Sequence, residues 1–196
     1  MSLAALLIMS PSVDDGPDLA AALGRRDTVV LDALIDRYGN GLLRYLLHLT
    51  GNRATAEDLF QETWLRVFER GAQYDPRRSF QGWLFIIARH LAIDDQRRQR
   101  TRSGDPIEPD GGGHAADLAA HAPSPFEAYA ARERRAHLAA TIGGLDPIYR
   151  EVLVLRFVHE LSLDEIAHIT GAVVPTVKSR LYRALDQMAC RLGEES

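Results

Sequence analysis

The side chains best suited to chemistry form a run of hydrogen-bond donors near the C-terminus of the 196-residue chain. They are Thr176, Lys178, Ser179, Arg180, Tyr182 and Arg183. A helix turns by 100° per residue, so it would point Ser179, Tyr182 and Arg183 away from a buried apolar face. That face would consist of Val177, Leu181, Ala184, Leu185 and Met188. Donors exposed on the first half of a helix can read base edges in the major groove of DNA, where one good contact discriminates by ~1–3 kcal/mol.

The residues before this helix are typical of a helix-turn-helix. Ala167, Gly171 and Val177 follow one another at the spacing that such a unit needs. A small Ala167 allows the helices to cross closely, Gly171 can adopt the left-handed conformation of the turn, and Val177 fills the junction. Ser162 to Glu165 has the pattern of a capping box. The plainer alternative is a capped helical hairpin with a solvated basic face.

Charge is segregated along the chain, although its net value is −4. Residues 174–192 contain four basic residues and one acidic residue, and residues 89–102 contain five arginines and two aspartates. Basic segments of this kind within an acidic chain indicate nucleic-acid binding. In the second segment, Arg89, Arg97 and Arg98 are candidates for contact with a DNA backbone. They could equally pair with Asp94 and Asp95 at helical spacing.

Nothing in the sequence indicates catalysis, and we expect no enzyme. Cys190 is the only cysteine, and the seven histidines are scattered, so we expect neither a disulfide nor a metal site. The glycine run at 111–113 lacks the lysine and hydroxyl of a phosphate loop, and the adjacent Asp94 and Asp95 diverge on a helix. We therefore expect no catalytic residue, metal or cofactor. The apolar run Leu3 to Met9 is too short to span a bilayer, so we expect a cytoplasmic chain without membrane insertion.

The hydrophobic periodicity is helical throughout, which predicts an all-α fold. Helices are expected over about 18–50, broken or bent near Gly39 and Gly41, over 54–69, and from Ser79 to about 100. Further helices are expected over 126–142, 146–158, from 162, and over 174–192. Residues 101–125 are rich in proline, glycine and acidic side chains and predict a flexible linker, with an ordered lid as the alternative. The predicted organisation is a flexible extension (1–17) and two helical domains (18–100 and 126–196) around that linker (101–125).

Three segments, in register, resemble the extracytoplasmic-function (ECF) group of sigma-70 family RNA polymerase sigma factors. AEDLFQETWLRV at 56–67 resembles the helix that grips the polymerase clamp. FQGWLFIIARH at 80–90, with Asp94 and Arg97-Arg98 after it, looks like the helix that melts and reads the minus-ten element. VKSRLYRA at 177–184 is similar to the minus-thirty-five recognition helix. The sequence departs from the group at His90, where asparagine is usual, and at Pro175, where glycine is common.

The resemblance implies a sigma factor that directs promoter recognition, melting and transcription initiation, with a region 2-like and a region 4-like domain. It assigns binding of the core polymerase to Asp58, Gln61, Glu62 and Leu65. It assigns minus-ten contacts to Arg89, His90, Asp94, Arg97 and Arg98, and minus-thirty-five contacts to the donors of 176–183. The implied partners are core RNA polymerase, through the β′ clamp and the β flap, promoter DNA, and an anti-sigma factor. Trp83 is expected to pack in the core rather than to stack on a base.

Two other interpretations stay open at this point. A DNA-binding regulator that acts without polymerase would explain the helix-turn-helix but not the N-terminal domain. A helical adaptor that binds only proteins would explain neither basic segment. Specific binding of duplex promoter DNA by the free chain would favour the first, and promoter-directed transcription that survives loss of Arg183 and Lys178 would favour the second.

Overall fold

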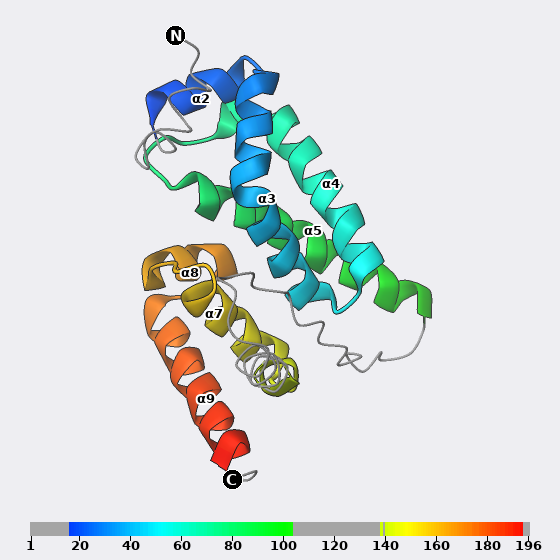
Figure 1. Cartoon of the computed structure of the whole chain (residues 1–196), viewed down its shortest axis with the longest axis vertical. Helices are drawn as coiled ribbons and strands as arrows, with labels where there is room; N and C mark the ends of the chain where they lie inside the picture. The colour runs from blue at the N-terminus through cyan, green and yellow to red at the C-terminus, as the bar shows by residue number, and fades with distance from the viewer. Residues whose placement is uncertain (1–15, 104–137, 139, 194–196) are drawn as a thin grey trace, which may run out of the picture.

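The computed structural model describes residues 16–103, 138 and 140–193. An N-terminal bundle contains α2 (Pro17–Gly24), α3 (Thr28–Thr50), α4 (Arg53–Arg70), the short 3-10 helix η1 (Gly71–Gln73) and α5 (Phe80–Ser103). A C-terminal bundle contains α7 (Pro147–Phe157), α8 (Leu163–Thr170) and α9 (Val174–Gly193). The described residues contain helices and no strand, which confirms the all-α prediction. In Figure 1 the C-terminal bundle lies against one side of the N-terminal one, with α8 nearest to it and α9 ending far from it.

The first long helical segment is divided at a place that the sequence analysis did not predict. The break lies between α2 and α3, where the Asp27 carboxylate accepts hydrogen bonds from the backbone N–H groups of Val29 and Val30 at 3.0 and 3.3 Å. This N-cap starts a new helix. The predicted break near Gly39 and Gly41 is absent, because α3 runs unbroken from Thr28 to Thr50.

Gly39 lies within α3 and faces α4. A Cβ atom on Gly39 would lie 3.5 Å from the ring of Phe60, an ordinary van der Waals contact. The glycine lowers helix propensity but does not interrupt the helix.

An aromatic cluster holds the N-terminal bundle together. Phe80 is fully buried at the start of α5, with its ring centroid 5.8 Å from that of Tyr74 and 6.5 Å from that of Trp64. Trp83 packs on the same cluster, at 5.4 Å from Tyr74 and 6.0 Å from Phe80. Trp83 is half-buried and packs against the apolar core, as the sequence predicted.

The two bundles share one continuous apolar core. It extends from Leu19 in α2 to Val177 in α9 and includes residues of α3, α5, α7 and α8. The sequence analysis predicted two helical domains around a linker, and in the structure these domains pack closely against each other. The predicted linker lies outside the described residues except at its first positions, as do the predicted extension except at its end and most of the predicted helix 126–142.

Candidate DNA and polymerase interfaces

The helix-turn-helix forms as predicted. The Ser162 hydroxyl accepts a hydrogen bond from the Glu165 backbone N–H at 3.2 Å, and the Glu165 carboxylate accepts one from the Ser162 N–H at 2.9 Å. These reciprocal bonds are the capping box that begins α8. Gly171 ends α8 in the left-handed conformation, at φ 66°. Val177 is fully buried in the junction of the two helices.

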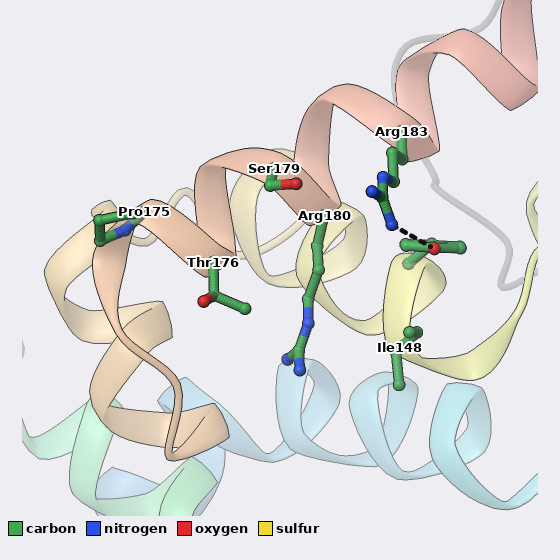
Figure 2. A pocket seen from close by; sticks show the side chains of 7 residues that line it. Ile148, Pro175, Thr176, Ser179, Arg180 and Arg183 are labelled. Carbon is green, nitrogen blue, oxygen red and sulfur yellow. Dashed lines mark hydrogen bonds between the residues drawn. The ribbon is translucent and has the colours of Figure 1, made fainter.

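The donors of α9 lie on its outer and flanking sides. Lys178, Ser179, Tyr182 and Arg183 are exposed, Tyr182 to 68%, whereas Thr176 and Arg180 are half-buried. Figure 2 shows Thr176, Arg180 and Arg183 extending from the same side of α9, with Arg183 pointing toward the start of α7. There they line a shallow pocket of about 320 Å³, and one Arg183 N–H donates to the Tyr149 hydroxyl at 3.4 Å.

Pro175 occupies the first turn of α9, and the helix continues through it. Proline is tolerated there because the first backbone N–H groups of a helix have no partner within the helix. One predicted core residue of α9 is misplaced: Leu185 is 39% exposed. Ala184 and Met188, on the same helix, pack with Leu145 and Leu153 in a small apolar cluster, and Leu185 is not part of this cluster.

A second basic surface joins α4 to α5. A pocket of about 470 Å³ is lined by guanidinium groups from both helices, together with His90, Asp94 and the apolar residues Ile87, Leu91 and Ile93. The guanidinium groups belong to Arg66, Arg70, Arg89 and Arg97. The structure thus brings together Arg89, His90, Asp94 and Arg97 of the predicted minus-ten set. Arg98 is exposed but is not among the residues lining this pocket.

Sequence analysis missed Arg66 and Arg70. Their four-residue spacing places them on one face of α4, but only the crossing of α4 over α5 brings that face to Arg89 and Arg97. Arg66 also donates to Glu62 at 2.9 Å. The nearest approach between Arg97 and Asp94 is 3.9 Å, and both side chains are mostly exposed. Such an exposed ion pair contributes little to stability, so Arg97 remains available to contact a DNA phosphate.

Arg89 has a partner that neither sequence-based alternative included. Its Nε donates to a carboxylate oxygen of Glu151, in α7, at 2.7 Å, and its side chain is 20% exposed. Glu151 is 8% exposed and also accepts a hydrogen bond from the Tyr45 hydroxyl at 2.9 Å. Burial, followed by the nearby Glu151 carboxylate, raises the pKa of Tyr45 well above its ordinary value, so this hydroxyl remains a donor. We call Tyr45, Arg89 and Glu151 the Glu151 cluster.

The predicted polymerase-binding residues lie together on the outer face of α4. Asp58, Gln61 and Leu65 are exposed, Leu65 to 57%, and Glu62 is half-buried beside Arg66. An exposed leucine flanked by acidic and amide side chains resembles the edge of a protein interface, where one apolar contact is surrounded by polar groups. This face is not covered by the C-terminal bundle.

Among the residues that the structure describes, no group of three or more histidine, cysteine, aspartate or glutamate side chains could hold a metal ion. No helix in the same part of the chain is long and apolar enough to cross a membrane.

A helix-turn-helix beside a second basic surface places the protein, by its fold, in the class of helix-turn-helix proteins. Residues 34–102 match the family described as Sigma-70 region 2, and residues 135–188 match Sigma-70, region 4. The ECF RNA polymerase sigma factor SigL of Mycobacterium tuberculosis is 32% identical over 177 residues, which are 86% of this chain and 92% of SigL. The chain belongs to the ECF group of the sigma-70 family.

Further similarities agree in family and fold. The ECF sigma factor SigE of Mycolicibacterium smegmatis is 32% identical over 84% of this chain, which spans only 62% of SigE. The solved structure of CnrH in complex with the cytosolic domain of CnrY superimposes with a TM-score of 0.65 at 26% identity, covering 91% of this chain and 97% of CnrH.

Proposed function

We propose that this chain is a sigma factor that binds core RNA polymerase and directs it to a specific set of promoters. The observation that supports this most strongly is the presence of two separate basic surfaces, one on α9 and one at the crossing of α4 and α5, beside an uncovered docking face on α4. A regulator acting without polymerase needs only the first of these. The family membership favours the same conclusion.

The proposed division of work follows the surfaces. The α4 face, with Asp58, Gln61, Glu62 and Leu65, would dock on the β′ clamp, and the C-terminal bundle would meet the β flap. The six donors of α9 would contact the minus-thirty-five duplex. Arginines of the α4–α5 pocket, with His90, would hold the unstacked minus-ten strand, because guanidinium groups bind phosphates in two-point geometry. The protein would act by binding rather than by catalysis.

Location and regulation are part of the proposal. A protein that works on promoters through polymerase would reside in the cytoplasm, at the nucleoid. CnrH has been solved in complex with the cytosolic domain of CnrY. We infer that this chain, too, is held by a regulatory partner of the anti-sigma kind until it is needed.

The test is reconstituted transcription with core polymerase and a promoter library, followed by sequencing of the transcript starts. The wild-type chain should redirect initiation to a defined set of promoters. Combined substitution of Arg183→Ala and Lys178→Ala should weaken those promoters by roughly 30-fold or more, since two contacts of ~1–3 kcal/mol each sum to at least ~2 kcal/mol. Arg25→Ala, at an exposed arginine just after α2, is the control and should leave initiation unchanged.

A chain that neither co-migrates with core polymerase nor changes where RNA synthesis begins would refute the proposal. Unchanged promoter choice in the double variant would refute the role of α9 alone.

A further inference from the structure

We propose that Glu151 is an internal inhibitor. Its carboxylate binds Arg89 of the α4–α5 pocket, the proposed minus-ten site, and holds the C-terminal bundle closed on the N-terminal one. The inference rests on the proposed function and adds a regulation that is built into the chain itself. Opening of the two bundles would then be a required step before the minus-ten strand can be bound.

The Glu151 cluster has the geometry of a specific contact rather than of a chance surface pair. Arg89 donates to both carboxylate oxygens of Glu151, at 2.7 Å from Nε and at 3.5 Å from a terminal nitrogen, and Tyr45 donates to the same carboxylate. An ionised carboxylate buried without partners would be costly, but here three hydrogen bonds compensate it. The cluster therefore favours closure only while all of its members are present.

The chemistry of the contact explains why it should inhibit. A carboxylate that accepts hydrogen bonds from one edge of a guanidinium uses the donors that would otherwise bind a DNA phosphate. α7 itself also lies over Arg89, because Pro147, Ile148 and Glu151 line one small pocket together with Arg89. A phosphate and Glu151 thus compete for the same side chain.

Other polar contacts connect the bundles around the Glu151 cluster. Ser79, before α5, donates to the Glu165 carboxylate of α8 at 2.7 Å. The guanidinium of Arg78 contacts the ring of His168, also in α8. The His159 ring lies 4.7 Å from that of Phe85 and 6.0 Å from that of Tyr45. Polar contacts distributed along α3, α5, α7 and α8 define one orientation of the bundles, which an apolar contact alone would not.

The experiment measures closure directly by energy transfer between two dyes on the full chain. One dye is attached to Cys190, the only cysteine and an exposed residue of α9, and the other to a cysteine introduced by Val29→Cys at an exposed site of α3. Glu151→Gln keeps the shape of the side chain but removes its charge and replaces one of the two acceptor oxygens with an NH2 donor. It should lower the ratio of closed to open molecules about tenfold, because charge-assisted hydrogen bonds are roughly twice as strong as neutral ones.

Two further variants make the result specific. Tyr45→Phe keeps the ring that stacks on Phe85 and removes only the hydroxyl. It should shift the ratio in the same direction, and its effect should not add to that of Glu151→Gln if both act on one contact. Asp32→Asn, which neutralises an exposed carboxylate of α3, is the control and should leave the ratio unchanged.

Binding of a fluorescent single strand with the minus-ten sequence provides the functional measurement. Glu151→Gln should bind it up to tenfold more tightly than the wild type. Equal closed fractions in the wild type and in Glu151→Gln would overturn the proposal, and so would a shift in closure without any gain in strand binding. A wild-type chain that closes as described but never supports initiation with core polymerase would instead refute the proposed function.

Discussion

At the residue scale, Glu151 and His159 are both polar and both buried between the bundles, yet their surroundings differ. Glu151 accepts hydrogen bonds from Arg89 and Tyr45. The Nε2 atom of His159 has no hydrogen-bond partner in the described part of the chain. Burial, followed by the charges of Arg44 and His48, lowers the pKa of His159 to about 4. The neutral ring is therefore part of what allows closure.

This shift predicts that acid opens the molecule. The pKa of His159 is about 4 in the closed form and ordinarily 6.5, so the closed form binds fewer protons. The contribution of neutral His159 to closure is therefore fully present above pH 6.5, the ordinary pKa. It is lost as the pH falls from 6.5 toward about 4, the pKa in the closed form. Between pH 7.5 and pH 5.5 the ratio of closed to open molecules should fall about tenfold. Energy transfer between the dyes, followed across this range, measures the ratio.

The matching variant for this prediction is His159→Gln, which cannot titrate. Its closure should depend less on pH, with a remainder from His48 and His168, whose pKa values are also lowered by burial and then by nearby arginine charge. A wild-type ratio that is flat from pH 7.5 to pH 5.5 would show that His159 is hydrated in the closed form.

At the element scale, Gly171 and Gly41 have different backbone conformations, so an added methyl group should affect stability in opposite directions at these two positions. Gly171 ends α8 at φ 66°, a conformation that residues with a Cβ rarely adopt, although a Cβ there would meet no atom within 4 Å. Gly41 lies inside the unbroken helix α3, where a Cβ would be 3.7 Å from the His159 ring, an ordinary contact. Space is sufficient at both positions, so backbone preference alone decides the effect of an added methyl group.

Alanine substitutions at these positions should change stability in opposite directions. Gly171→Ala should lower the free energy of unfolding by ~1–2 kcal/mol, the cost of a left-handed residue with a Cβ. Gly41→Ala should raise it by ~0.5–1 kcal/mol, since alanine is the better helix former. Urea unfolding followed by circular dichroism measures both. Destabilisation by Gly41→Ala would mean that the contact between α3 and His159 has no room for a methyl group.

These elements also show how far the sequence could predict the structure. The helix-turn-helix was predictable because its signals are local: Ser162, Glu165 and Gly171 lie within ten residues and act on the backbone next to them. The possible break near Gly41 is absent because glycine lowers helix propensity but does not by itself end a helix, whereas the Asp27 cap does start one.

The candidate site was predictable only where it lies on one helix. The exposed donors of α9 follow from helical periodicity, and so does the outer face of α4. The pairing of Arg89 with Glu151 connects residues 62 positions apart. No periodicity within either helix encodes it, because it depends on how two bundles pack. Arg66 and Arg70 were missed for a similar reason, because their place beside Arg89 and Arg97 depends on how α4 packs on α5.

At the scale of the whole molecule, closure and promoter binding place opposite demands on the chain. Promoter elements two helical turns of DNA apart are separated by ~70 Å. Residues 104–137, between the bundles, would span more than ~100 Å if fully extended. The covalent connection thus permits the bundles to separate, and the contacts along α3, α5, α7 and α8 oppose separation. The order of events then depends on which surfaces the closed form leaves accessible.

The closed form covers Arg89 but leaves Leu65 57% exposed, so docking on the clamp should not require opening. Binding of a β′ clamp coiled-coil fragment should be equally tight for the wild type and for Glu151→Gln, as measured by calorimetry. Leu65→Ala should weaken it roughly five- to tenfold, because burying the exposed half of a leucine contributes ~1 kcal/mol. Leu185→Ala, at an exposed apolar residue of α9, is the matched control. Tighter clamp binding by Glu151→Gln would mean that closure also hinders docking, and opening would then have to precede it.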